Sequence, residues 1–267
     1  MTSGELAATF NAAQRGFRAL SAVLWEPLGA ALAERAQLAP GQRVLDVCAG
    51  AGASAIPAAQ AVGLHGQVDA VDLAANLLAE GRAKAAHLPQ LRFVQADVLS
   101  WQPPGVRYDR VLCGYGVFFL PDMDAGACHL ISLLREGGRL AVSTWAKGSL
   151  SEVLNCLFDA VAELLGAPVP TSPARAAAAR IETEALMSGW LDALGLVDTQ
   201  VSRVSLQLRL TPELAWDLAQ GTGARRAFDA LDQAGVDRVR QGYLRRLRDR
   251  GMDVLDASSL IGTGHRS

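Results

Sequence analysis

Three acidic residues stand at the ends of three apolar runs in the first half of the 267-residue chain. Asp46 follows Val44-Leu45, and Asp72 and Asp97 close the next two runs. Such runs are typical of parallel strands buried on both faces, and ligands bind at the carboxyl ends of these strands. An acid placed there accepts hydrogen bonds from ribose hydroxyls, as we expect for Asp72, or faces the edge of an adenine, as we expect for Asp97.

A glycine turn follows the first acid, with the sequence Cys48-Ala49-Gly50-Ala51-Gly52. Gly50 and Gly52 allow a tight bend and let the backbone approach a ligand without a Cβ in the way. Asp72 lies 20 residues after Gly52, which is the spacing expected for a ribose-binding acid at the second strand. The alternative for Asp72 is an N-cap of the following helix.

The elements that must position these residues alternate between strand and helix up to Trp145, which predicts an α/β fold with a doubly wound, mostly parallel sheet. The expected strands are 43–47, 68–71, 91–94, 110–113 and 139–144. The expected helices between them are 54–62, 75–86 and 123–135, the last closed by Gly137-Gly138 as a C-cap. A helical segment at 5–37 precedes them. After residue 145 we expect helices at 150–165 and 182–194, a strand at 201–210, two or three helices in 212–250 and a last strand at 258–262.

Five ordered motifs over roughly residues 40–146 resemble the class I S-adenosylmethionine-dependent methyltransferases, in particular the small-molecule branch related to the ubiquinone and menaquinone biosynthesis methyltransferases. The motifs are Leu45 to Gly52, Asp72-Leu73, Ala96-Asp97-Val98, Val111 to Asp122, and Leu134 to Leu140. One departure is Cys48, which stands where the family usually has glycine. The resemblance implies a seven-stranded Rossmann-like sheet with an antiparallel final pair. It also implies an N-terminal helical segment at 1–37 and a methyltransferase domain at 38–267, with cap insertions at about 150–180 and 212–250.

The resemblance further implies S-adenosylmethionine as cofactor. Asp46 would organise the glycine loop and, through it, the methionyl ammonium, and apolar side chains would wall the adenine. Tyr115, between two glycines after the fourth strand, is the catalytic candidate, either as a polar contact near the reacting methyl or only as a wall. The residues assigned to the cofactor are Asp46, Cys48, Ala49, Gly50, Gly52, Asp72, Leu73, Leu77, Ala96, Asp97, Val98, Gly114 and Tyr115.

The expected activity is methyl transfer to a small, apolar or aromatic metabolite. A sulfonium is already activated, so the protein mainly aligns the reactants, and the lack of a recognisable catalytic triad agrees with this expectation. Two alternatives remain open. One is a cofactor-binding protein without transferase activity, which Cys48 favours. The other is a nicotinamide dinucleotide fold, which Gly50 to Ala55 would permit, but Asp46 beside an approaching diphosphate argues against it.

Composition limits the partners. The formal net charge is −2, from 25 basic and 27 acidic residues, so nucleic acid is not expected. The arginines of residues 238–250 indicate a solvated helix face, and the apolar residues between them a buried stripe.

No apolar run approaches the roughly 18 residues of a membrane span, and Met1 to Phe10 lacks the pattern of a secretory signal. We expect a cytoplasmic protein with a small-molecule substrate, no membrane or metal partner, and an oligomeric state that the sequence leaves open. Four free thiols are expected at Cys48, Cys113, Cys128 and Cys156.

Overall fold

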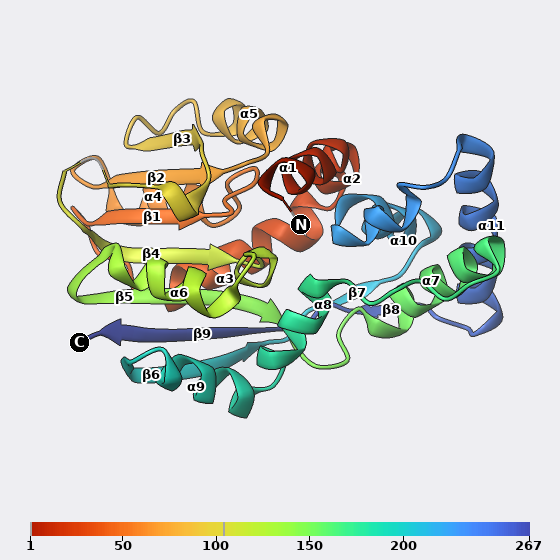
Figure 1. Cartoon of the computed structure of the whole chain (residues 1–267). Helices are drawn as coiled ribbons and strands as arrows, with labels where there is room; N and C mark the ends of the chain where they lie inside the picture. Colours follow the sequence, from red (N-terminus) through yellow and green to blue (C-terminus); the bar gives the residue numbers. More distant parts are fainter. Residues whose placement is uncertain (1, 104) are drawn as a thin grey trace.

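The structure is a computed structural model that describes residues 2–103 and 105–267. Seven strands form one sheet in the order β3-β2-β1-β4-β5-β9-β6 (Figure 1). Strands β1 to β5 run parallel, and β9 is antiparallel to both of its neighbours. This confirms the doubly wound, mostly parallel sheet and its antiparallel final pair. The strands are β1 Arg43–Val47, β2 Gln67–Asp72, β3 Leu91–Gln95, β4 Tyr108–Gly114, β5 Leu134–Trp145, β6 Leu196–Val204 and β9 Ser259–Arg266.

Alternate residues of each parallel strand face different helices. Val44 belongs to a hydrophobic cluster with residues of α3 and α4, whereas Leu45 belongs to a second cluster that includes residues of α6, and both side chains are fully buried. Because both faces are covered, the strand reads as an almost continuous apolar run. The helices that cover the sheet are α3 Glu26–Arg35, α4 Ala55–Val62, α5 Ala75–Lys84, α6 Met123–Ser132 and α9 Glu184–Ala193.

Several expected boundaries were wrong. Helix α6 ends at Ser132, and Gly137-Gly138 lie inside β5 instead of capping the helix. Leu134 is fully buried and pairs with Tyr108, so β5 begins five residues before the expected Arg139. The strand expected at 201–210 divides in two, because β6 ends at Val204 and β7, Gln207–Arg209, pairs with β8, Val254–Asp256, in a separate small sheet.

A second lobe, at the right of Figure 1, packs around its own hydrophobic core. Its helices are α7 Ser151–Leu165, α10 Pro212–Gly221 and α11 Gln233–Asp249. In α11 the expected stripe of Val239, Tyr243 and Leu247 is buried. Arg246 of α11 pairs with Glu163 of α7, and Arg250, just after α11, pairs with Asp159 of α7 at 3.3 Å.

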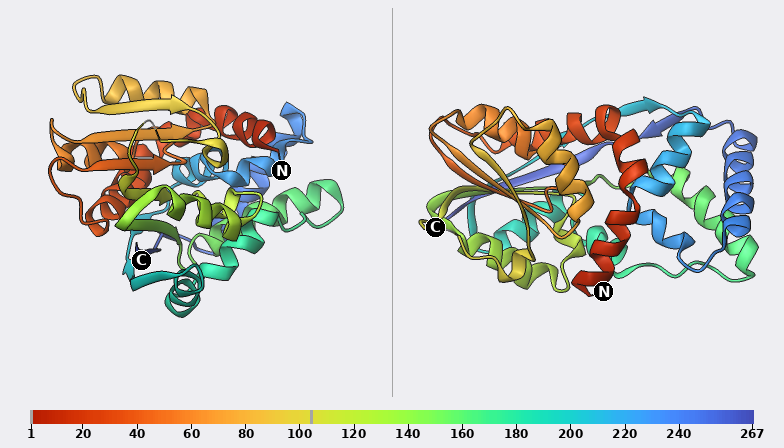
Figure 2. Two further views of the ribbon diagram at one scale, coloured as in Figure 1. Left: turned by 60° about the vertical axis from the view of Figure 1, so that its left-hand side comes forward. Right: turned by 90° about the horizontal axis from the view of Figure 1, so that it is seen from above.

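The N-terminal helices lie between the sheet and the second lobe (Figure 2). They are α1 Ser3–Ala12, α2 Gln14–Ala19 and a π-helix at Ser21–Trp25 that leads into α3. On one side, the nearly buried Glu80 of α5 accepts hydrogen bonds from Gln14 Nε2 at 2.7 Å and Arg18 Nε at 3.1 Å. On the other side α2 crosses α10 so closely that a Cβ on Gly16 would lie 2.6 Å from the amide nitrogen of Gly221. The N-terminal segment is therefore fixed to both parts of the molecule.

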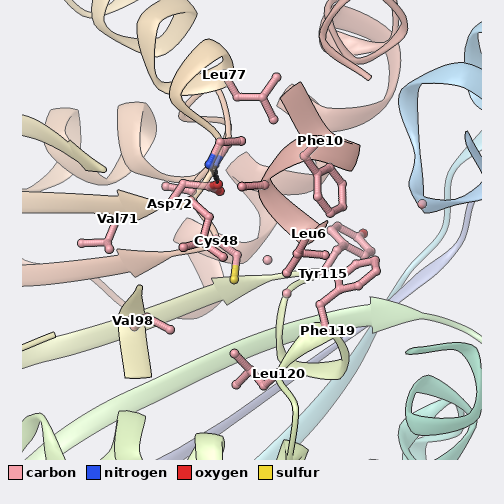
Figure 3. A pocket seen from close by; sticks show the side chains of 18 of the residues that line it. Leu6, Phe10, Cys48, Val71, Asp72, Leu77, Val98, Tyr115, Phe119 and Leu120 are labelled. Atoms are coloured by element: carbon pink, nitrogen blue, oxygen red, sulfur yellow. Dashed lines mark hydrogen bonds between the residues drawn. The ribbon is translucent and has the colours of Figure 1, made fainter. Parts of the chain in front are cut away.

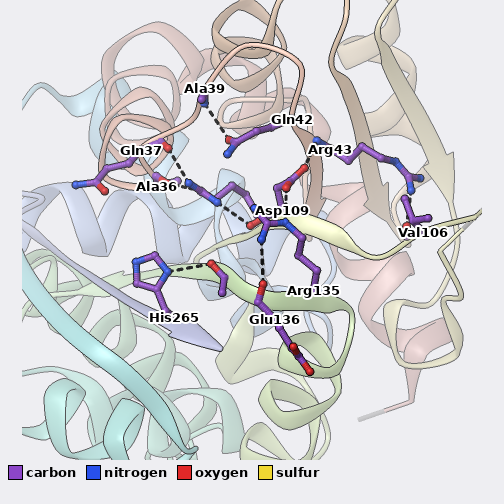
Figure 4. A network of polar contacts seen from close by, with 12 residues as sticks. Ala36, Gln37, Ala39, Gln42, Arg43, Val106, Asp109, Arg135, Glu136 and His265 are labelled. Carbon is purple, nitrogen blue, oxygen red and sulfur yellow. Dashed lines mark hydrogen bonds and ion pairs between the residues drawn. The ribbon is translucent and has the colours of Figure 1, made fainter. Parts of the chain in front are cut away.

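The amino-terminal edge of the sheet is closed by polar contacts (Figure 4). Asp109 accepts hydrogen bonds from the Arg43 amide at 2.8 Å and from Arg135 Nε at 2.6 Å, and Arg110 Nε donates to the Ala36 carbonyl at 2.9 Å. These groups satisfy one another, and the opposite, carboxyl-terminal edge is left for ligand chemistry. Among the described residues, no helix combines the length and the apolar character needed to cross a bilayer.

Candidate functional site

A cavity lies at the carboxyl-terminal edge of the sheet, between the strand ends and the N-terminal helices (Figure 3). Eleven of the thirteen predicted cofactor residues line it, and their contact with the cofactor stays a prediction. These eleven are Cys48, Ala49, Gly50, Asp72, Leu73, Leu77, Ala96, Asp97, Val98, Gly114 and Tyr115.

The two remaining candidates, Asp46 and Gly52, lie outside the cavity wall. Asp46 is fully buried beneath the glycine loop. Gly52 has a φ of +85°, and a Cβ there would meet the Phe93 ring at 2.9 Å. Gly52 is therefore required for the turn and for close packing on β3, which is a structural role.

The glycine loop is held by Asp72. Its Oδ2 accepts a hydrogen bond from the Gly50 amide at 2.8 Å and its Oδ1 accepts one from the Ala74 amide at 2.7 Å. Asp72 thus fixes both the loop after β1 and the turn into α5. An ionised carboxylate offers about four acceptor positions, so it keeps capacity for ribose hydroxyls. Burial raises the pKa of Asp72, and these amide hydrogen bonds oppose that effect.

Asp46 carries an unsatisfied oxygen. Its Oδ2 accepts a hydrogen bond from Ser54 Oγ at 2.7 Å, but its Oδ1 has no partner among the residues that the structure describes. Burial raises the pKa of Asp46 to about 7; the Ser54 hydrogen bond opposes this rise and the charge of Asp72 adds to it. A buried carboxylate without a full set of partners favours a cation or donor nearby. Ser54 connects this carboxylate to the cavity, which it lines.

Cys48 adopts the left-handed conformation, with a φ of +55°, that glycine adopts more easily. Its side chain packs against Gly116, where a Cβ would come within 2.5 Å of the Cys48 Cβ. The neighbouring Cys113 thiol and burial raise the pKa of Cys48. The thiol is thus protonated at neutral pH and contributes bulk to the loop without acting as a nucleophile.

The N-terminal helix α1 forms a wall of the cavity that the sequence analysis missed. Ser3 Oγ donates a hydrogen bond to Asp97 Oδ2 at 2.7 Å, and Asp97 Oδ1 accepts one from the Leu99 amide at 2.9 Å. Leu6 and Phe10 of α1 also line the cavity (Figure 3). The only signal in the sequence was their i, i+4 spacing, because no residue of α1 is fully buried.

Four aromatic side chains that line the cavity pack against one another. Phe17 stacks on Trp25 with centroids 4.9 Å apart, and Tyr115 lies 4.4 Å from Trp145 and 5.9 Å from Trp25. The Tyr115 hydroxyl is 2.5 Å from Ser259 Oγ. Burial raises the pKa of Tyr115, so its hydroxyl stays protonated at neutral pH and cannot act as a general base there.

The backbone of Tyr115 is also in the left-handed region, with a φ of +54°. Strained residues of this kind cluster at functional sites. Its amide donates to the Ser143 carbonyl at 3.2 Å, which fixes the ring over the cavity. Trp25, Trp145 and Ser259 were not predicted, because they come from elements distant in sequence.

The charged residues in the described lining of the cavity are all acidic. Asp72 and Asp97 line it, whereas no Lys, Arg or His is found among its described lining residues. His129 is half-buried, and its Nε2 lies 3.0 Å from the Val98 carbonyl; it is not among the described lining residues of the cavity. The cavity therefore suits a cation or a neutral molecule better than an anion.

The two expected cap segments contribute unequally. Segment 212–250 supplies Thr222 and Gly223 to the wall, whereas the described lining includes no residue of 150–180. Segment 150–180 instead packs, through α7, in the second lobe.

Comparisons with known proteins match the part of the chain that carries the glycine loop, Asp72, Asp97 and Tyr115. Residues 44–138 match a protein family described as "Methyltransferase domain". The chain is 31% identical over 138 residues to aklanonic acid methyltransferase DauC from Streptomyces sp., covering 51% of this chain and 62% of that protein. It is 33% identical over 109 residues to 2-phytyl-1,4-naphtoquinone methyltransferase from Synechocystis sp., covering 39% of this chain and 45% of that protein.

Solved structures share the fold at low sequence identity. The [4+2]-cyclase SpnF has a TM-score of 0.62 at 15% identity, with 100% of this chain and 97% of that chain covered. The YcgJ protein from Bacillus has a TM-score of 0.56 at 18% identity, with 90% and 98% covered. Residues 44–138 thus match a methyltransferase domain, the aligned regions span less than two thirds of both curated relatives, and the whole chain shares the fold of these solved structures, in agreement with the predicted class I S-adenosylmethionine-dependent methyltransferase.

Proposed function

We propose that this protein transfers the methyl group of S-adenosylmethionine to a neutral, apolar or aromatic small molecule. The observation that carries the proposal is the cavity itself. It is lined both by the acids and glycine loop of the methyltransferase motifs and by the aromatic rings of Phe17, Trp25, Tyr115 and Trp145. We also propose that residues 1–37 form a helical segment that serves as a wall of the site, and that 38–267 is the methyltransferase domain with insertions at about 150–180 and 212–250.

The residues present fit the cofactor. Asp72 has acceptor capacity for the ribose, and Leu73, Leu77 and Val98 offer apolar contact for the adenine, whose edge Asp97 would face. The unpartnered Asp46 Oδ1 lies beneath the loop, where it would favour the methionyl ammonium. A Cβ on Gly50 would come within 3.2 Å of Phe17 and 3.9 Å of Leu77, so glycine keeps the cradle between them open.

The cofactor supplies an activated methyl group on a sulfonium, and the chain supplies position and a dry environment. The aromatic rings would exclude water and hold a flat or apolar acceptor, which would keep the acceptor atom from being solvated. Alignment of this kind is worth up to about 7–11 kcal/mol in favourable cases. No His lines the described cavity and Tyr115 stays protonated, so the acceptor would have to be nucleophilic without a general base from these residues.

The absence of cationic side chains from the described lining separates substrate classes. A carboxylate or phosphate substrate would bring a negative charge beside Asp72 and Asp97 without a counter-ion. Burial of an unpaired charge is strongly unfavourable. A neutral phenol, quinol or similar acceptor has no such penalty, and it gains contact with the aromatic rings.

A second candidate function is cofactor binding without methyl transfer. Cys48, in place of the usual glycine, favours it, and SpnF shows that a protein described as a [4+2]-cyclase can have this fold. Two measurements separate the candidates. Calorimetry with S-adenosylhomocysteine tests cofactor binding, and incubation with methyl-labelled S-adenosylmethionine and a panel of neutral phenols, quinols and matched carboxylates tests transfer.

Label in a neutral aromatic product supports the proposal. Binding of S-adenosylhomocysteine without label in any product would favour the second candidate. Label confined to the carboxylates would contradict the inferred substrate class, because the cavity offers them no cation.

A further inference from the structure

The first two helices of the chain are anchored unequally. The close crossing of Gly16 and Gly221 fixes α2 to the second lobe. Helix α1, Ser3–Ala12, has no buried residue along its length. The fully buried Ala13 ends α1 and begins α2. An element with few buried contacts detaches at a low cost in free energy, so α1 can move on Ala13 while α2 stays in place.

Helix α1 covers part of the cavity. Five residues at its N-terminal end and along one face belong to the described lining: Thr2, Ser3, Leu6, Ala7 and Phe10. The Phe10 ring meets Phe119 edge-on with centroids 5.3 Å apart, and Figure 3 shows both rings with Leu6 at the cavity. Because Ser3 contacts Asp97, a nucleoside placed against Asp97 would lie beside α1 and would enter past it.

Single hydrogen bonds hold the two ends of α1 to the strand-end loops. Ser3 Oγ donates to Asp97 Oδ2 at 2.7 Å, and the Asn76 amide donates to Asn11 Oδ1 at 3.0 Å. Asp97 also accepts from the Leu99 amide, but a carboxylate has about four acceptor positions. The contact of Ser3 with Asp97 can therefore break, and it can form again over a ligand that also donates to Asp97.

We propose that α1 is a lid that swings about Ala13 to admit the cofactor, and that the hydrogen bond from Ser3 to Asp97 is the latch that holds it closed. The proposal rests on the proposed function, because it takes the ligand beside α1 to be S-adenosylmethionine. Opening gives access to the cavity, and closure excludes water from it, which favours methyl transfer.

Hydrogen exchange measures the opening without any ligand. A free helix of 10 residues is marginal in water, so a detached α1 loses its internal hydrogen bonds and its amides exchange. Ser3→Ala removes the latch but leaves Thr2, whose side chain caps the helix by accepting from the Glu5 amide. Ser3→Thr keeps a hydroxyl. Ser100→Ala is the matched control, because Ser100 Oγ donates to the carbonyl of the same Asp97 at 3.0 Å from outside α1.

Surface plasmon resonance measures the passage of S-adenosylhomocysteine into and out of the cavity. We expect Ser3→Ala to speed exchange in α1 by about tenfold, the factor for one lost hydrogen bond to a charged group, and to leave exchange in α2 unchanged. It should raise the association and dissociation rate constants of S-adenosylhomocysteine by a similar factor. The dissociation constant should change much less, because the latch closes with and without ligand.

Faster exchange in α1 together with a rise of both rate constants supports the proposal, provided that Ser3→Thr and Ser100→Ala keep the wild-type values. Unchanged exchange in α1 of Ser3→Ala would overturn it. Faster exchange with unchanged rate constants would also overturn it, because the ligand would then enter by another route. A rise of the dissociation rate constant alone would make Ser3 an ordinary ligand contact. Failure of the wild type to bind S-adenosylhomocysteine would instead overturn the proposed function, and the exchange comparison would still decide whether the latch holds α1.

Discussion

Asp46 should make the free protein less stable as the pH rises, and Asp46→Asn should remove this effect. The pKa of this carboxyl is raised from 3.8 to about 7, mainly by burial. A raised pKa means that the folded state binds the proton more tightly than the unfolded state. The free energy of unfolding therefore falls as the pH rises from near 4 to near 7, and the full loss persists above 7.

The magnitude follows from the size of the pKa rise. A rise from 3.8 to about 7 corresponds to roughly 4 kcal/mol of lost stability at pH 8. Asparagine carries no charge, but its NH₂ group, placed where the unpartnered Oδ1 of Asp46 lies, would have N–H donors without acceptors. This costs about 1–3 kcal/mol at every pH. We thus expect the variant to gain stability relative to the wild type between pH 4.5 and pH 8, by an amount approaching 4 kcal/mol. At pH 8 the variant should be the more stable protein.

Urea unfolding at several pH values measures this difference. Ser54→Ala is the matched control. It removes the hydrogen bond that lowers the pKa of Asp46 but keeps the carboxyl. The free energy of unfolding of Ser54→Ala should therefore still fall with rising pH, and the fall should extend to a higher pH than in the wild type. A constant difference in the free energy of unfolding between Asp46→Asn and the wild type across the pH range would refute the reasoning.

Asp46→Asn should also bind S-adenosylmethionine more weakly at pH 8, since the anion that favours the methionyl ammonium is gone. A variant that is both more stable and a weaker binder would mark Asp46 as a functional residue that reduces stability.

Three further predictions concern the loop and its supports. Asp72→Asn should weaken S-adenosylhomocysteine binding by about 1.5–3 kcal/mol in calorimetry, because the ribose and the Gly50 amide lose an ionised acceptor; an unchanged dissociation constant would contradict the ribose assignment. Gly50→Val should abolish that binding, since Gly50 has a φ of +53° and its Cβ would enter the cradle beside Phe17 and Leu77; normal binding by the folded variant would show that the loop does not contact the ligand. Gly16→Ala should cost about 1–3 kcal/mol in urea unfolding because it forces α2 from α10, whereas Gly189→Ala, with open space around it in α9, should gain roughly 0.5–1 kcal/mol; equal effects of the two would mean that the helix crossing is not tightly packed.

The parts of the fold that the sequence predicted are those with local signals. Strand β1 matches its predicted bounds, Arg43–Val47, because an apolar run ending in an acid and a glycine turn is a signal contained in the run itself. The predicted loop residues meet at one cavity because parallel strands end at a common edge. Three sequence-distant acids are thereby brought to, or just beneath, the same cavity.

The parts that the sequence did not predict depend on contacts between distant segments. Residues 134–138 read as the end of a helix, but Leu134 pairs with Tyr108 and is fully buried, so tertiary pairing overrides the local preference. The partner of Tyr115 is Ser259, 144 residues away. The π-helix that positions Trp25 has no recognisable sequence pattern, because its extra residue is accommodated by packing.

Residues from outside the matched methyltransferase domain also line the cavity. The family match covers residues 44–138 and includes the loop, Asp72, Asp97 and Tyr115. Phe17 and Trp25 precede it, and Trp145, Thr222 and Gly223 follow it, yet all five line the same cavity. The glycine crossing between α2 and α10 joins these two groups, since Gly16 precedes Phe17 and Gly221 precedes Thr222. On the proposed function, the substrate would then bind where the N-terminal helices meet the second lobe, outside the matched domain.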